Sequence, residues 1–405
     1  MSRSIKRLAY ASSAAVLASV LAACGSSSPT STTTAGGSSS TTAAAAALST
    51  SSFTSDFSAM AQLKSVAASG KGKVGVLLPE TTTSARYTSF DQPYLTKAFE
   101  QAGLSSDQFI ITNAGGSDST ELTQAQTDIT QGASVLVMDP IDSGVGVSIE
   151  SYAKSHGVKV IDYDRLTLGG SRDFYVSFDN VKVGQLIGQG FVSCVSAWNV
   201  SSPHVLIMRG AATDNNATLF AQGYDGVLAQ YFSSNQYVKV GEPAGTWDPP
   251  TAQTTFQQQY TAHPDINSVV TPNDDNANAI ISYLKTLNIP TKKFPTTGQD
   301  ATATGLQNIV AGYQCGTVYK PIYLEAQAAA ALALYLRAGQ TPPSGLVNGQ
   351  TADSQANSQV PSSLLTPIWV TTANIQSTVV KDGFVPAAKI CTGSLASACQ
   401  QYGIS

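Results

Sequence analysis

Two adjacent charged residues, Asp164 and Arg165, are the clearest sign of a chemical role in this sequence. They follow an apolar run that contains Val158, Val160 and Ile161 and that predicts a buried parallel strand. In an open α/β sheet, ligands bind at the carboxyl ends of the strands. A carboxylate only accepts hydrogen bonds and a guanidinium only donates them, so the pair can hold several hydroxyls of a small polar molecule. A surface ion pair is the alternative interpretation.

The same pattern recurs along the chain, because short apolar runs alternate with helical stretches from Lys73 onward. That alternation is typical of a parallel sheet covered by helices. Strands with polar carboxyl ends are predicted at residues 73–78, 134–138, 158–162, 204–208, 268–271, 294–297 and 317–319. Three of these strands lie before about Ser177 and four lie after it, which favours two α/β domains facing each other across a cleft over one sheet.

Helices are expected at residues 217–230, 277–287 and 325–337 from composition and period. A Pro/Gly/Ser/Gln-rich loop is expected from there to about Gln359, followed by a strand at 364–370. Asp214-Asn215-Asn216 and Asn273-Asp274-Asp275 stand just before two of the helices. They can face a ligand, but helix capping is the alternative, since Asp and Asn are preferred N-cap residues.

Aromatic residues stand in two loops that a ligand could reach. One is the turn after the first strand, with Arg86, Tyr87 and Phe90, and the other carries Trp247 within GTWDP. A pyranose can lay its C–H faces on aromatic rings while its hydroxyl edge contacts planar polar groups. Packing beneath the Pro249-Pro250 pair is the alternative role for Trp247.

Charge and motifs argue against several classes of function. The formal net charge of -4 and the pI of 5.4 give no reason to expect nucleic acid or an anionic membrane as partner. Dinucleotide, P-loop, nucleophile-elbow, zinc and EF-hand motifs are absent. Asp164 and Asp300 could form a glycosidase pair, but Arg165 and Lys320 at the same sheet edges would lower carboxyl pKa values. The sequence therefore predicts that the protein is not an enzyme and that it has no cofactor and no metal site.

The N-terminus carries export signals. Arg3, Lys6 and Arg7 precede an apolar stretch over residues 9–22, which predicts a signal peptide at residues 1–23. Its end, LAAC, resembles the lipobox of bacterial lipoproteins, which implies cleavage before Cys24 and a lipid on its sulfur. An ordinary secretory signal is the alternative. Residues 24–70 are rich in Ser, Thr, Ala and Gly and predict a disordered tether.

The remaining cysteines number four, an even count that predicts disulfides in an oxidising compartment. Cys391 and Cys399 are nearest in sequence and form the first choice of pair, which leaves Cys194 with Cys315. The sequence permits three pairings.

Several stretches together resemble the D-xylose-binding proteins of bacterial ABC importers. They are VIDYDR, DFYVSFDNVKVG, TDNNATLFAQG, PNDD, GQDA, TVYKPI and VPSSLLTPIWV…IQSTVVKDGF, in order over nearly all of residues 72–384. These proteins have two Rossmann-like α/β lobes of the type I periplasmic-binding-protein class, joined by a three-segment hinge, with the ligand in the interlobe cleft. The resemblance implies one lobe from residues 72–177 with 321–365 and another from 178–320 with 366–399. It places the hinge crossings near 177–179, 320–321 and 364–367.

The resemblance also implies a set of sugar contacts, position by position. These are Asp164, Arg165 and Arg86 in the first lobe, and Asp214, Asn216, Trp247, Asn273, Asp300 and Lys320 in the second. Tyr87 stands where the family commonly has tryptophan, and Thr88-Ser89 replace more polar or charged residues. That departure leaves the choice of sugar open.

A function follows from this resemblance. It implies an extracytoplasmic monomer, held at the cell membrane only by the lipid on Cys24, that binds D-xylose and delivers it to a membrane permease. The alternatives are the same fold binding glucose, arabinose or ribose, or serving as a sugar sensor. A transcription regulator of this fold would need an N-terminal helix-turn-helix, and the signal and tether occupy its place.

Overall fold

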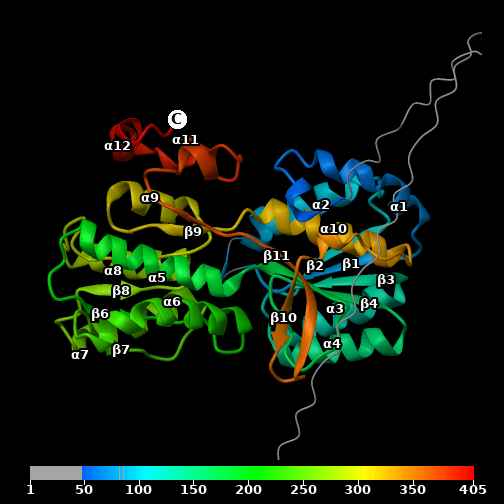
Figure 1. Cartoon of the computed structure of the whole chain (residues 1–405), viewed down its shortest axis with the longest axis horizontal. Coiled ribbons are helices and arrows are strands. Elements are labelled where there is room, and N and C mark those ends of the chain that lie inside the picture. The colour runs from blue at the N-terminus through cyan, green and yellow to red at the C-terminus, as the bar shows by residue number, and fades with distance from the viewer. Residues whose placement is uncertain (1–47, 82, 85) are drawn as a thin grey trace, which may run out of the picture. The chain divides into compact units, whose positions relative to one another are not determined.

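The computed structural model describes residues 48–405 except 82 and 85 (Figure 1). The predicted signal peptide, Cys24 and most of the predicted tether lie outside the described residues. From residue 48 the predicted tether is wrong, because η1 (Thr50–Ser52), η2 (Ser58–Leu63) and α1 (Lys64–Ser69) are folded. Phe57, Met60 and Leu63 are buried in the core of the first sheet. These apolar side chains are three residues apart and form one buried stripe. The many small polar residues around them give the segment the composition of a disordered tether.

The first sheet has seven strands in the order β10-β11-β5-β4-β3-β1-β2. All neighbours run parallel except the antiparallel pair β10 and β11. The strands are β1 (Lys73–Leu78), β2 (Phe109–Asn113), β3 (Ala133–Met138), β4 (Lys159–Tyr163), β5 (Phe174–Phe178), β10 (Gly349–Asp353) and β11 (Ser358–Leu365). The order 2-1-3-4-5 is a doubly wound one, in which ligands bind beyond the carboxyl ends of the strands near β1 and β3.

Helices cover both faces of this sheet (Figure 1). One face carries α1, α2 (Gln92–Gln101) and α10 (Ile322–Arg337), and the other carries α3 (Asp118–Thr130) and α4 (Ser143–Ser155). Side chains alternate between the two cores along each strand, so Val76 packs toward α2 and α10 while Leu77 packs toward α3 and α4. Burial on both faces is the reason why these strands are continuous apolar runs in the sequence.

A second group of strands follows β5. β6 (His204–Ile207), β7 (Val238–Gly241) and β8 (Ser268–Val270) form a parallel sheet in the order β7-β6-β8, and β9 (Thr317–Tyr319) pairs antiparallel with β12 (Ile368–Val370). The predicted strand at 294–297 is wrong: only a single bridge, from Thr296 to Val269, forms there. Pro295 has no N–H to donate to a ladder. The accompanying helices are α5 (Asn180–Ala197), α6 (Asn215–Ser233), α7 (Pro249–Ala262), α8 (Asp274–Thr286), α9 (Ala303–Ala311), α11 (Ala387–Ile390) and α12 (Ala396–Gln401).

The chain passes between the two groups of strands three times. It does so from β5 to α5, from β9 to α10 and from β11 to β12. These passages coincide with the three crossings that the family resemblance implied. The expected loop up to Gln359 is wrong in part, since it contains β10 and the start of β11. The predicted strand at 364–370 is interrupted at Thr366 and Pro367.

Two disulfides lie in the second part of the chain. Cys194 on α5 is bonded to Cys315 just before β9, and Cys391 is bonded to Cys399 in the C-terminal segment. This is the pairing named first above. The second disulfide closes a short loop that links α11 to α12.

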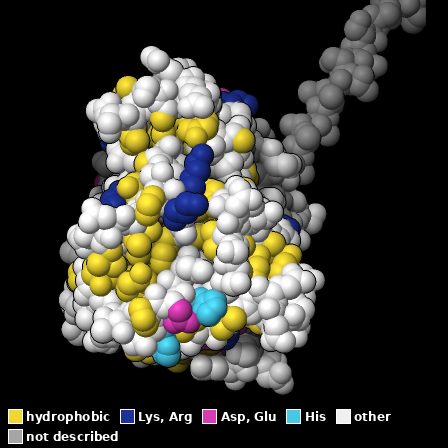
Figure 2. All heavy atoms as spheres, turned by 90° about the vertical axis from the view of Figure 1, so that its left-hand side faces the viewer, with side chains coloured by type: hydrophobic (Ala, Val, Ile, Leu, Met, Phe, Trp, Pro, Cys, Tyr) yellow, Lys and Arg dark blue, Asp and Glu magenta, His cyan; other side chains and the backbone are white. Residues whose placement is uncertain are grey.

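The surface at the end that carries α7, α8 and β7 has few charges (Figure 2). Hydrophobic side chains gather on one side of this face, Lys and Arg side chains lie near its middle, and acidic side chains are sparse. This face therefore lacks the dense positive charge of a nucleic-acid-binding surface. Over residues 48–405, leaving aside 82 and 85, no helix has the length and apolar character needed to span a bilayer.

Three buried carboxyl groups should make the protein less stable as pH rises. Burial raises the pKa of Glu121 and Asp274 to about 8 and that of Asp128 to about 7. Carboxyl groups of an unfolded chain have pKa values of about 4, so folding takes up protons between the two values. The stabilisation is present below about pH 4 and is lost as pH rises through 7 to 8. We expect calorimetry to give a lower unfolding temperature at pH 8.5 than at pH 5.5.

Glu121→Gln should flatten this pH dependence, because it removes one titrating carboxyl while keeping an acceptor for the Ile141 N–H. Glu100→Gln, at an exposed position on α2, is the matched control and should keep the wild-type slope. Equal slopes in the two variants would contradict the assignment to Glu121.

Candidate ligand-binding site

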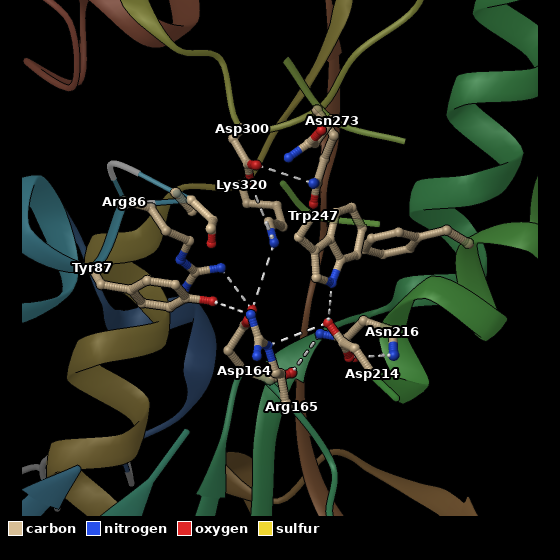
Figure 3. Close-up of a pocket in the computed structure, with 14 residues that line it drawn as sticks. Arg86, Tyr87, Asp164, Arg165, Asp214, Asn216, Trp247, Asn273, Asp300 and Lys320 are labelled. Carbon is tan, nitrogen blue, oxygen red and sulfur yellow. Dashed lines mark hydrogen bonds and ion pairs between the residues drawn. The ribbon is translucent and has the colours of Figure 1, made fainter. Parts of the chain in front are cut away.

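A cavity of about 390 Å³, partly open to solvent, lies beyond the carboxyl ends of both groups of strands (Figure 3). It is lined by all but one of the predicted ligand residues: Arg86, Tyr87, Asp164, Arg165, Asp214, Asn216, Trp247, Asn273, Asp300 and Lys320. The exception is Phe90, which lines an adjoining cavity instead. The structure thus brings together side chains from both halves of the fold.

The structure adds Thr83, Ser84, Phe220 and Gln299 to the lining. Phe220 lies four residues after Asn216 on α6, and this spacing places both on one helix face, so the sequence did contain a signal for it. Gln299 directly precedes Asp300. Thr83 and Ser84 belong to the loop after β1, where a ligand contact is expected but no pattern selects particular residues.

Asp164 stands at the end of β4 in an unusual backbone conformation. Its φ is 59°, in the left-handed region that few non-glycine residues adopt. Its carbonyl oxygen accepts hydrogen bonds from the hydroxyls of Tyr175 and Ser177, and from the amide of Asn216 on α6 at 3.0 Å. These bonds hold the residue so that its carboxylate enters the cavity. Strained backbone of this kind clusters at ligand sites.

The carboxylate of Asp164 stays ionised because cations surround it. Burial alone would raise its pKa, but Arg86, Lys320 and Arg165 outweigh burial and lower the pKa to about 2. Arg86 Nη1 donates to Asp164 Oδ1 at 2.7 Å. Lys320 Nζ lies 3.6 Å from the same oxygen. Asp164 is therefore a hydrogen-bond acceptor at every physiological pH.

Arg86 organises the first-lobe side of the cavity. Its guanidinium forms a bidentate pair with Asp91 at 3.0 and 2.7 Å and also donates to Glu325 on α10 at 3.0 Å. Burial raises the pKa of Glu325 to about 8, against the opposing effect of Arg86. Most of the N–H groups of Arg86 are thus committed to protein carboxyls, so Arg86 chiefly positions Asp164.

Arg165 links the first-lobe loops to the second lobe. Its Nη2 donates to the Tyr87 hydroxyl at 3.0 Å, and its Nη1 donates to the carbonyls of Pro140 and Ile141. Its Nε lies 3.3 Å from Asp214 Oδ2. Arg165 therefore holds the Tyr87 ring beside the cavity. Burial raises the pKa of the Tyr87 hydroxyl, against the opposing effect of Arg165, so the ring stays neutral.

Lys320 and Asp300 supply the opposite side. Lys320 follows β9, and its Nζ lies 3.6 Å from Asp300 Oδ1 as well as 3.6 Å from Asp164 Oδ1. Asp300 has a φ of 95° and accepts a hydrogen bond from Gln299 at 3.1 Å. All of these side chains are nearly inaccessible to solvent, with Lys320 only 3% exposed. One lysine thus bridges carboxylates delivered by the two groups of strands.

The polar runs before α6 and α8 cap helices and line the cavity at the same time. Asp214 Oδ1 accepts from the Asn216 N–H, and Asn273 Oδ1 accepts from the Asn276 N–H. Asp214 Oδ2 also accepts from the indole N–H of Trp247 at 3.1 Å. Asp214 and Asn273 can therefore cap a helix and face a ligand at the same time.

Trp247 is held in place by close packing against Gly210, where a Cβ would overlap the indole ring. We expect Gly210→Ala to displace Trp247 and to weaken ligand binding by about tenfold, since a well-placed aromatic contact contributes about 0.5–1.5 kcal/mol. Gly226→Ala on α6, where a Cβ would meet nothing within 4 Å, should leave binding unchanged. Calorimetric titration of both variants checks this. Unaltered binding in Gly210→Ala would show that the ring position is unimportant.

The arrangement is suited to holding a small polar molecule without reacting with it. Ionised acceptors and donors alternate around the cavity, and Tyr87, Trp247 and Phe220 present rings beside them. Within the described part of the chain, no group of three or more His, Cys, Asp or Glu side chains could hold a metal ion. The fold and the cavity define a binding protein whose two α/β halves enclose a small polar ligand.

Comparison with known proteins identifies the family. The chain matches the periplasmic binding protein domain over residues 74–341 and belongs to that family. It is 36% identical over 296 residues to the D-xylose-binding periplasmic protein of Escherichia coli, covering 73% of this chain and 86% of that one. It is 32% identical over 339 residues to the multiple sugar-binding periplasmic receptor of Rhizobium radiobacter, covering 80% and 93%.

A solved structure shows the same fold. The carbohydrate transporter solute binding protein from Chloroflexus aurantiacus, in complex with D-glucose, is 26% identical with a TM-score of 0.69, covering 78% of this chain and 97% of that one. The predicted α/β fold class and the resemblance to D-xylose-binding proteins are thereby confirmed. These relatives are periplasmic sugar-binding proteins and a transporter's solute binding protein rather than enzymes, which supports the prediction that this chain performs no catalysis.

Proposed function

We propose that the protein is the extracytoplasmic receptor of an ABC importer, and that it binds an aldose monosaccharide, D-xylose first among them, for delivery to a membrane permease. The observation that carries the proposal is the charged bridge from Asp164 through Lys320 to Asp300, which joins the two halves across the cavity. Relatives named for D-xylose and for multiple sugars support the choice of ligand class.

The chemistry of the cavity matches a pyranose. Each sugar hydroxyl donates one hydrogen bond and accepts others, so it can sit between a carboxylate such as Asp164 and a cation such as Lys320. The apolar faces of the ring can lie on Trp247 and Tyr87. A sugar that contacts both halves binds the closed form best and so favours closure.

The two lobes of this proposal follow the strands. We assign residues 72–177 with 321–365 to one lobe and 178–320 with 366–399 to the other, and we extend the first lobe to residue 48. The three passages of the chain between the strand groups support these boundaries.

Another aldose is the second candidate. Tyr87 replaces the tryptophan common in the family, and the Chloroflexus aurantiacus structure holds D-glucose. A thermal-shift panel of xylose, glucose, arabinose and ribose, followed by calorimetry, separates the candidates, because a sugar at 100 times its Kd stabilises the folded state by about 2.7 kcal/mol. The largest shift should come from xylose. A flat response to every aldose would overturn the proposal.

The membrane anchor is part of the same proposal. We expect Cys24→Ser to abolish lipid attachment, so that the protein, now lacking its lipid, separates from the membrane fraction after cell lysis. Metabolic labelling with a radioactive fatty acid should mark the wild type and leave the variant unlabelled. Label on both proteins would show that Cys24 is not the lipidated residue.

A further inference from the structure

A second cavity adjoins the proposed sugar pocket. The two share Ser84, Arg86 and Asp300 in their linings, so these three residues lie at the boundary between them. The second cavity encloses about 1000 Å³ of space, part of it open to solvent, against about 390 Å³ in the first. Phe90, expected in the sugar pocket, lines this second cavity.

Both aromatic and polar side chains line the second cavity. Phe90 and Phe384 stack with ring centroids 3.8 Å apart, and the Tyr94 ring lies 6.1 Å from that of Phe90. Val385 and Pro386 extend this apolar wall, while Ser89, Thr302 and Lys389 supply donors around it. Aromatic rings bordered by hydroxyl and amine donors are the kind of lining that a sugar ring contacts.

Part of this wall comes from residues after Phe384, where the resemblance to the D-xylose-binding proteins ends. The segment is held firmly: Val385 and Ile390 are buried, and Gln307 on α9 donates to the Lys389 carbonyl at 2.8 Å. The disulfide between Cys391 and Cys399 closes the loop that follows. The wall is therefore formed before any ligand arrives.

Asp300 stands at the junction of the two cavities. It is 9% exposed, and within the described chain its Oδ1 takes part in an ion pair with Lys320 at 3.6 Å but in no hydrogen bond. A buried carboxylate oxygen in this position can accept a hydroxyl of a sugar in either cavity.

We infer that the second cavity is a subsite for a second sugar ring, so that the receptor binds a disaccharide with one ring in each cavity. This inference rests on the proposed sugar-binding function and extends its ligand class. One ring contacts Asp164, Lys320 and Trp247, and the other lies against Phe90 and Phe384 with its hydroxyls toward Lys389.

Calorimetry with D-xylose and β-1,4-xylobiose on the exported chain tests the inference. We expect xylobiose to bind at least as tightly as xylose. Ala303 at the start of α9 lines the second cavity and not the first. Ala303→Trp should therefore fill the second cavity and raise the Kd of xylobiose at least tenfold, equivalent to about 1.4 kcal/mol, with little change for xylose. Thr304→Trp, exposed on the same helix and lining neither cavity, should change neither affinity.

The outcomes separate this inference from the function on which it rests. Tight binding of xylose without binding of xylobiose, or an equal loss of both in Ala303→Trp, overturns the subsite and leaves the monosaccharide receptor standing. Binding of disaccharide alone overturns the monosaccharide proposal and supports the subsite. If the panel selects another aldose instead of xylose, calorimetry uses that aldose and its disaccharide, for example glucose and cellobiose. Failure of every sugar overturns both.

Discussion

Replacing Asp164 with asparagine should weaken sugar binding by about tenfold to a few hundredfold, because a hydrogen bond to a charged group contributes roughly 1.5–3 kcal/mol. Asparagine keeps the shape of the side chain and tolerates the left-handed backbone at φ 59°. It removes only the charge that Arg86 and Lys320 contact. Calorimetric titration with the tightest sugar of the panel measures the loss.

Stability offers a second readout of the same substitution. The pKa of Asp164 is lowered to about 2 in the folded protein. Its stabilising contribution is therefore present above the unfolded pKa of about 4 and is lost as pH falls toward 2. We expect Asp164→Asn to unfold at a lower temperature than wild type at pH 7, and the difference to shrink as pH falls through this range.

Two controls separate charge from backbone strain and from general surface effects. Asp164→Ala removes the charge and also places a residue of low left-handed tolerance at φ 59°, so it should unfold at a lower temperature than Asp164→Asn. Asp225→Asn alters a half-exposed partner of Arg209 and should leave sugar affinity within about twofold. Wild-type affinity in Asp164→Asn would show that the site is misplaced.

The sequence indicated which residues would line one cavity because parallel strands in each sheet end on the same side. Asp164, Asp214, Asn273 and Lys320 each follow a buried strand, and the carboxyl ends of these strands, from both groups, face the same cavity. β1 and β3 were predictable as well, since burial on both faces makes them largely apolar runs.

Where the prediction failed, the determining contacts are distant or the signal is weak. Phe90 and Tyr87 share one turn, but η3 (Tyr87–Asp91) is a single π-helical turn that directs them into different cavities. The role of Arg86 depends on Glu325, which lies 239 residues away on α10. β10 is largely polar and is defined by pairing with β11, which no local pattern reveals.

Replacing Lys320 with methionine should strongly weaken sugar binding, because its amine is the only cation within ion-pairing distance of both Asp164 and Asp300 among the described residues. Without it, two buried carboxylates would approach each other from opposite lobes as closure begins. Leaving a buried charge uncompensated costs on the order of 3–5 kcal/mol, so we expect the sugar affinity to fall by about 100-fold or more. Calorimetry measures this loss, and Lys381→Met, at an exposed position, is the matched control.

A second substitution tests whether repulsion across the cavity is the cause. Asp300→Asn removes one of the two opposed charges, so the double variant Lys320→Met with Asp300→Asn should bind sugar more tightly than Lys320→Met alone. Residues in one charge network are expected to show coupling of about 0.5–3 kcal/mol in such a cycle. If the losses of sugar affinity in Lys320→Met and Asp300→Asn simply add in the double variant, Lys320 contributes only its own contact with the sugar. If they offset each other, the lysine is what allows the two lobes to bring their carboxylates to the same ligand.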